Sequence, residues 1–233
     1  MAPITLYPRW NKRSTDINEK IEPFRKYIFI CEGANTEEYY FEKLINMRKE
    51  LGIHDMIDIC LLKKTGKERD ISYPKALVEL AKKYKRKVEN NFDSKRDKMI
   101  VVFDGDIFEE KVKGYDELIT EIEKEDIAAV TNPNFELFLL LHLENSYENF
   151  IKDNENRFLL KDEKDKYSYA FKLLSQKTKM NSKKNKQIGS LAKNIEIAIE
   201  QEKKINQDIH NITGKVSSNI GKIIENIIQD RAQ

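Results

Sequence analysis

The sequence predicts an α/β fold: a mainly parallel sheet of about four strands flanked by helices, followed by an all-helical C-terminal extension. Four short apolar runs occur up to Val130, and segments with apolar residues at helical spacing lie between them. No strand-like run follows Val130. Strands that alternate with helices indicate βαβ units, and these form parallel sheets with right-handed crossovers.

The first predicted strand, residues 27–31, is a continuous apolar run that is too short for a buried helix and suits a strand covered on both faces. Further strands are predicted at residues 57–62, 99–103 and 127–130. If the first and third strands are neighbours, as in many doubly wound sheets, the residues that follow them meet at one edge.

Helices are predicted between these strands and throughout the second half of the chain. Thr36 can cap the first helix, its apolar residues recur at helical spacing, and Gly52 closes it. The other predicted helices span residues 72–91, 115–123, 135–143, 147–160, 190–204 and 216–228.

We divide the chain into three parts. Residues 1–25 are polar, carry three of the five prolines and are expected to form an N-terminal arm. Residues 26–145 are expected to form the α/β domain, and residues 146–233 the helical extension.

Composition limits the class of protein. Of 233 residues, 39% are hydrophobic, enough for a core, so wholesale disorder is excluded. Lys and Arg number 42 against 40 Asp and Glu, so any basic surface must be local. Two cysteines cannot form a disulfide framework or a cysteine zinc site. No signal peptide or membrane span is evident, so we expect a soluble cytoplasmic protein without membrane contact.

Acidic residues follow two of the predicted strands. Glu32 follows the first, with Glu37 soon after, and Asp104 and Asp106 follow the third. Two carboxylates at about 4 Å repel by roughly 4 kcal/mol at an effective dielectric of 20, so such a cluster favours a bound cation. Oxygen ligands suit Mg²⁺ or Mn²⁺. The alternative for Asp104-Gly105-Asp106 is an ordinary turn.

A third segment, residues 131–142, follows the fourth strand. Pro133 suits a helix start, and Glu136 falls in the first turn of an otherwise apolar helix. Glu136 either complements the helix dipole or adds a ligand to the acidic cluster. His142 is either a core histidine or a direct participant in the site.

Together these segments resemble the RloB-like family. The resemblance lies in Cys31-Glu-Gly-X-X-Thr-Glu-X-X-Tyr-Phe41, Phe103-Asp-X-Asp106 and Asn132-Pro-X-Phe-Glu-Leu-Phe-Leu-Leu-Leu-His142. It is close over residues 27–143 and looser beyond. The family usually has Pro where this chain has Glu38, which is a change at the helix start only.

The resemblance implies a Toprim-like α/β fold, as in topoisomerases, bacterial primases and OLD-family nucleases. It implies that Glu32 is a metal ligand or general acid/base, and that Asp104 and Asp106 bind metal. It also implies that Glu37 and Glu136 bind a second ion or orient the first one's ligands. RloB-like proteins are typically encoded beside an ABC/SMC-type ATPase in phage-defence and abortive-infection loci.

Basic residues indicate where phosphates could bind. Lys63, Lys64, Lys67 and Arg69 follow the second strand at the same sheet edge. Residues 172–193 contain seven lysines, including Lys177, Lys179, Lys183 and Lys184, and no acidic residue. Because residues 175–187 also lack strong apolar periodicity, the stretch predicts a flexible basic loop. For this loop and for the lysines at residues 82–87, the alternative is a solvated surface.

The leading hypothesis is therefore a metal-dependent nuclease, acting on DNA or RNA in phage defence with an ABC/SMC-type ATPase. No P-loop and no Gly-X-Gly-X-X-Gly is present, so the chain itself does not resemble an ATPase or a dinucleotide-binding protein. The alternative is a non-catalytic subunit that binds metal or nucleic acid and docks on that ATPase.

Overall fold

A computed structural model describes residues 24–68, 71, 73–105, 114–160 and 166–231. Its sheet has the strand order β2-β1-β3-β4-β5. The strands are β1 (Arg25–Cys31), β2 (Ile57–Leu61), β3 (Lys98–Asp104), β4 (Ile127–Asn132) and β5 (Ser217–Ser218). The first four pair in parallel, and β5 is antiparallel to β4. The predicted α/β fold is confirmed, with a short fifth strand added.

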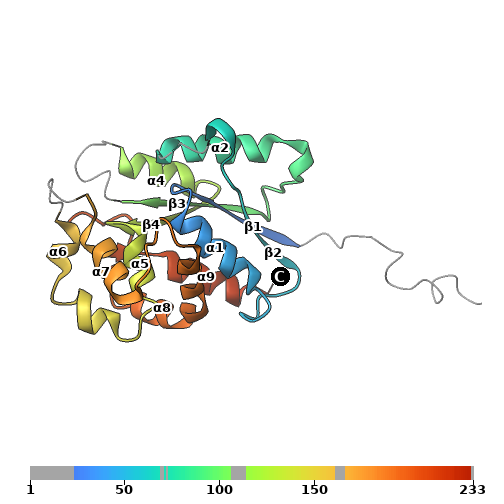
Figure 1. The fold of residues 1–233 in the computed structure, drawn as a ribbon. Coiled ribbons are helices and arrows are strands. Elements are labelled where there is room, and N and C mark those ends of the chain that lie inside the picture. Colours follow the sequence, from blue (N-terminus) through green and yellow to red (C-terminus); the bar gives the residue numbers. More distant parts are fainter. Residues whose placement is uncertain (1–23, 69–70, 72, 106–113, 161–165, 232–233) are drawn as a thin grey trace, which may run out of the picture.

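Helices cover both faces of the sheet (Figure 1). One face carries α2 (Pro74–Arg86) and α4 (Tyr115–Glu123), which pack on Ile28 and Ile30 of β1. The other face carries α1 (Thr36–Asn46) and the C-terminal helices, which share a core with Phe29 and Cys31. Alternate residues of β1 thus enter separate cores, as a strand buried on both faces requires.

The second half is mostly helical, as predicted, but its segments are shorter. They are α5 (Phe135–Leu140), a π-helical turn (Tyr147–Ile151), α6 (Glu155–Leu159), α7 (Tyr169–Thr178), a 3-10 segment η4 (Lys186–Asn194), α8 (Ile195–Glu202) and α9 (Ile220–Gln229). Two short 3-10 turns, Gly66–Glu68 and Val88–Asn90, flank α2.

The prediction of a flexible basic loop at residues 172–193 is wrong. The segment forms most of α7, a turn and most of η4, and η4 packs on α1. Ile188 is fully buried, and Gly189 lies so close to α1 that a Cβ there would come within 2.2 Å of the Tyr39 carbonyl oxygen. Only glycine permits this approach of the two backbones.

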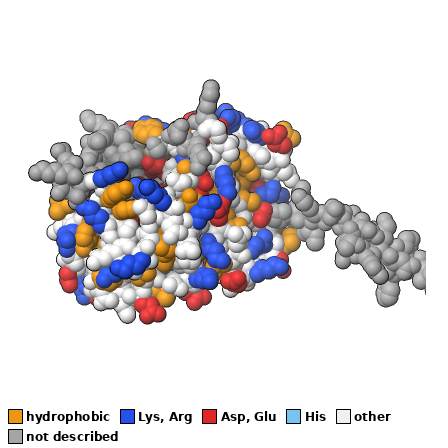
Figure 2. All heavy atoms as spheres, viewed as in Figure 1, with side chains coloured by type: hydrophobic (Ala, Val, Ile, Leu, Met, Phe, Trp, Pro, Cys, Tyr) orange, Lys and Arg blue, Asp and Glu red, His pale blue; other side chains and the backbone are white. Residues whose placement is uncertain are grey.

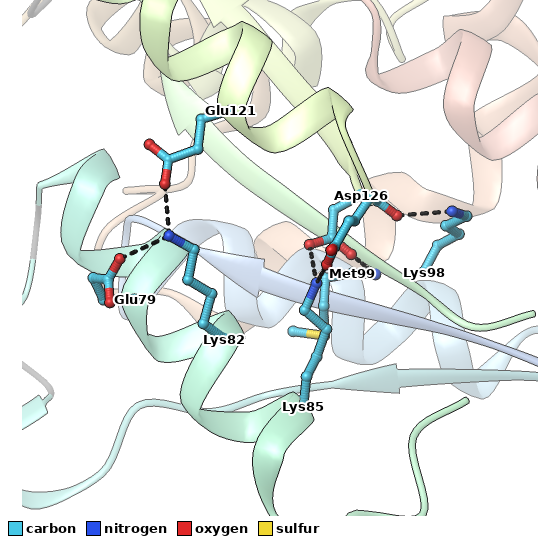
Figure 3. Close-up of polar contacts among 8 residues, drawn as sticks. Glu79, Lys82, Lys85, Lys98, Met99, Glu121 and Asp126 are labelled. Carbon is cyan, nitrogen blue, oxygen red and sulfur yellow. Dashed lines mark hydrogen bonds and ion pairs between the residues drawn. The ribbon is translucent and has the colours of Figure 1, made fainter. Parts of the chain in front are cut away.

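Two lysines of α2, Lys82 and Lys85, face carboxylates of α4 and of the turn after it (Figure 3). Lys82 lies 2.6 Å from Glu121, and Lys85 lies 2.7 Å from Asp126. Asp126 also accepts a hydrogen bond of 3.1 Å from the Met99 main-chain N–H, which ties this pair to β3. These lysines are thus paired across the helix interface rather than gathered into a basic surface.

The C-terminal segment closes one edge of the sheet. The Asn219 side chain accepts from Val130 N–H at 2.8 Å and donates to the Ala128 carbonyl at 2.9 Å, so it satisfies main-chain groups of β4. The carboxylate of Glu202 accepts from the main-chain N–H groups of Gly221 and Lys222 at 2.8 Å and holds the start of α9. Across the described residues, none of the helices combines the length and apolar character that a bilayer crossing requires.

Candidate functional site

Parallel pairing of β1 with β3 brings Glu32 and Asp104 together. Cys31 is in register with Val102, and the Glu32 N–H donates to the Val102 carbonyl at 2.9 Å. The Asp104 main-chain N–H donates to Oε2 of Glu32 at 3.1 Å. The two strand ends therefore meet at one edge, as the sequence predicted.

Four predicted acidic residues line one cavity of about 250 Å³ at this edge: Glu32, Glu37, Asp104 and Glu136. Glu37 comes from the first turn of α1 and Glu136 from the first turn of α5, because these helices begin just beyond β1 and β4. Asp106, the fifth predicted acid, lies outside the described residues.

Glu37 is buried against the loop that follows β1. A Cβ at Gly33 would lie 2.0 Å from Glu37 Oε2, so the carboxylate occupies the space that glycine leaves. Burial raises the pKa of Glu37 to about 7, and the negative charge of Glu136 adds to the rise. Main-chain N–H groups and Lys64 oppose it. Glu37 is thus partly protonated near neutral pH.

Glu136 is held by a residue that sequence reasoning missed. Ser182 is fully buried and its hydroxyl donates to Glu136 Oε1 at 2.9 Å. Ser182 lies in the lysine-rich run, where no periodicity or motif distinguishes it. The basic segment therefore contributes directly to the acidic cavity.

Lys63 and Lys64 are consecutive but differ in their surroundings. Lys64 is buried, and its ammonium donates to the main-chain carbonyls of Glu32 and, at 2.6 Å, of Ile71. Burial lowers the pKa of Lys64, while nearby carboxylates, Glu37 first, oppose the shift. Lys63 is exposed and forms an ion pair with Glu42 of α1. Arg69 lies outside the described residues.

Of the four lysines predicted in the basic segment, the structure places Lys183 among the residues that line the acidic cavity. Lys177, Lys179 and Lys184 are exposed at the end of α7 and in the turn after it. The ammonium of Lys177 lies 4.2 Å from the centre of the Phe150 ring. Their role in binding nucleic acid stays a prediction.

His142 is a core residue. Its ring is fully buried, and Nδ1 lies 3.0 Å from the Phe138 carbonyl, which can only accept. Nδ1 therefore carries the proton, and Nε2 accepts from the Tyr40 hydroxyl at 2.9 Å. Burial lowers the pKa of His142 to about 4, so the ring is neutral.

The cavity offers oxygen donors, which fit a hard cation such as Mg²⁺ or Mn²⁺. Within the part of the chain that the structure describes, no group of three or more His, Cys, Asp or Glu residues is arranged to hold a metal ion. Glu32 and Asp104 are two members of the predicted ligand set, and the third, Asp106, is outside the described residues.

Fold and cavity define the class: an α/β protein with carboxylates gathered at the carboxyl edge of a parallel sheet. The model of one family, described as RloB-like protein, matches residues 27–227. The chain therefore belongs to the RloB-like family, and the match continues through the C-terminal helices. Searches of curated proteins and of solved structures find no similar chain.

Proposed function

We propose that this protein is a metal-dependent nuclease of Toprim-like type that hydrolyses phosphodiester bonds in DNA or RNA. The observation that supports the proposal best is the arrangement of Glu32 and Asp104, which meet in a cavity that Lys183 also lines. Carboxylates suit a divalent cation, and a lysine beside them suits the phosphate that such a cation binds.

Each residue has a chemical role in this proposal. Glu32 and Asp104, with Asp106, would hold Mg²⁺ or Mn²⁺, which when bound polarises a phosphate oxygen and lowers the pKa of water. Glu37 can accept or donate a proton near neutral pH, because burial and Glu136 raise its pKa to about 7. Lys183 neutralises charge that develops on the phosphate.

The biological setting is proposed from the family. The resemblance to proteins of phage-defence and abortive-infection loci supports a defence role with an ABC/SMC-type ATPase as partner. In that role, the ATPase would sense or translocate nucleic acid, and this chain would cut it.

The test is a cleavage assay on labelled DNA and RNA, with Mg²⁺ or Mn²⁺ and with EDTA, in the presence and absence of the ATPase. Asp104→Asn should reduce cleavage to the EDTA background while nucleic-acid affinity stays close to that of the parent. Asp55→Asn is the matched control, because Asp55 is exposed just before β2, at the opposite sheet edge. Cleavage by Asp104→Asn equal to that of the parent would refute the proposal.

The second candidate is a non-catalytic subunit that binds metal or nucleic acid and docks on the ATPase. It predicts no metal-dependent cleavage by this chain, with or without the ATPase, and a stable complex of the two proteins on gel filtration.

A further inference from the structure

We propose that the nucleic acid bound at this cavity is single-stranded, and that Tyr167 and Phe171 stack an unpaired base beside Lys183. The inference rests on the proposed function in one respect: it takes the acidic cavity to be the place where a phosphodiester binds. The strand preference and the stacking residues are additional to that function.

The two rings form a stacked pair. Their centroids lie 4.3 Å apart with an interplanar angle of 17°. Phe171 is in the first turn of α7 and buried, and its main-chain N–H donates to the Ser168 hydroxyl at 3.2 Å. Tyr167 precedes the helix and is half-buried. Phe171 thus packs against one face of the Tyr167 ring, and Tyr167 is the member of the pair that reaches solvent.

Lysines flank this stack and connect it to the cavity. The Lys183 ammonium lies 5.9 Å from the Tyr167 ring centre and 5.8 Å from that of Phe171, and Lys183 also lines the acidic cavity. The Lys166 ammonium lies 5.6 Å from the Tyr167 ring centre. A nucleotide with its phosphate near Lys183 would therefore have an aromatic surface within reach of its base.

The mixture of rings and cations favours a single strand over a duplex. Backbone contacts alone suffice to hold a duplex, whereas proteins that bind single strands add aromatic side chains on which bases stack. A surface ring reaches only a base that is not already paired within a helix. Two further pairs repeat the arrangement on the same part of the molecule: Arg157 lies 4.3 Å from the Tyr169 ring centre, and Lys177 lies 4.2 Å from that of Phe150.

Figure 2 shows the surface over α6, α7 and α8. Lys and Arg side chains alternate there with hydrophobic ones, so the cations do not form one continuous basic patch. This alternation matches the stacking platforms of single-strand binders.

The test is fluorescence anisotropy in EDTA. Every protein compared carries Asp104→Asn, so that the oligonucleotides stay intact. Probes are a single-stranded DNA, a single-stranded RNA of the same sequence, and the duplex DNA. Tyr167→Leu should weaken single-strand binding about 5- to 150-fold, the equivalent of one lost base stack, and change duplex binding less than about twofold. Tyr167→Phe keeps the ring and should restore most of the affinity.

Two further variants sharpen the test. Lys183→Gln should weaken binding and flatten the salt slope of log K by about 0.7 for a single strand. Tyr73→Leu removes an exposed tyrosine just before α2 and should change nothing. Thermal melts of every variant show whether a loss of binding reflects a loss of fold.

The inference is overturned if Tyr167→Leu leaves single-strand binding unchanged, or weakens duplex binding equally. Comparison of the affinities for single-stranded DNA and single-stranded RNA shows whether a 2′-hydroxyl contributes to binding. The two proposals fail separately. Ring-dependent binding without cleavage refutes the nuclease alone, and cleavage without ring dependence refutes the stacking alone.

Discussion

Charged side chains have opposite arrangements in two regions of this molecule. Between α2 and α4, Lys82 and Lys85 lie within 3.0 Å of carboxylates (Figure 3). In the acidic cavity, Glu37 and Glu136 are both buried, and the negative charge of Glu136 adds to the rise in the pKa of Glu37. The first arrangement stabilises the fold, whereas the second opposes it, which is typical of residues kept for function.

The largest expected effect on stability is that of Lys64→Met. The substitution leaves the carbonyls of Glu32 and Ile71 without their buried donor and removes a positive charge from beside Glu37. We expect the free energy of unfolding, measured by urea denaturation, to fall by about 2–5 kcal/mol.

Lys63→Met is the matched control, since the same change falls on the adjacent residue. Lys63 is exposed and paired with Glu42, so its loss should cost less than about 1 kcal/mol. Equal losses of unfolding free energy from the two variants would show that the hydrogen bonds from Lys64 to Glu32 and Ile71 do not stabilise the fold.

Asp126→Ala tests the α2–α4 region. Asp126 pairs with Lys85 and accepts from the Met99 N–H, and both carboxylate contacts are mostly shielded from solvent. Its removal should lower the free energy of unfolding by about 2–3 kcal/mol in urea denaturation. Glu121→Ala removes an exposed partner of Lys82 and should cost less than about 1 kcal/mol. A larger loss for Glu121→Ala would contradict this account.

Glu37→Gln should stabilise the protein. We expect it to raise the free energy of unfolding by about 1–3 kcal/mol above pH 7 in EDTA. The folded pKa of Glu37 is raised to about 7, so between about pH 4.5 and 7 the folded protein binds more protons than the unfolded chain. Stability from this group therefore falls as pH rises through that window. Urea midpoints of both proteins at pH 5 and pH 8 measure the difference, which should shrink at pH 5.

His142 titrates in the opposite direction and must be separated from Glu37. Its folded pKa is lowered to about 4, so its contribution to stability is lost as pH falls from about 6.5 toward 4. The wild-type pH profile contains both effects, whereas the difference between wild type and Glu37→Gln isolates the carboxylate. If the difference between the urea midpoints of wild type and Glu37→Gln does not change with pH, the pKa of Glu37 is not raised in the folded protein.

The sheet and the meeting of Glu32 with Asp104 could be predicted, because continuous apolar runs mark strands buried on both faces. The carboxyl ends of neighbouring parallel strands then meet. Two residues of β5 carry no strand pattern, so that strand was missed. The burial of Lys64 and the bond from Ser182 to Glu136 depend on tertiary contacts. Propensity and spacing along the chain do not encode such contacts. The roles of Asp106 and Arg69 stay predictions.

The closure of β4 by Asn219 affects how the protein is made. Val130 leaves the ribosome long before residues 217–219, which complete this edge, and before η4, which covers α1. At roughly 5–20 residues per second, the nascent sheet spends several seconds with an unpaired edge and an uncovered apolar face. An exposed strand edge is a template for pairing with other chains. Newly made protein is therefore most prone to aggregation before residues 217–219 and α9 are synthesised, and slower expression with abundant chaperones should favour its recovery.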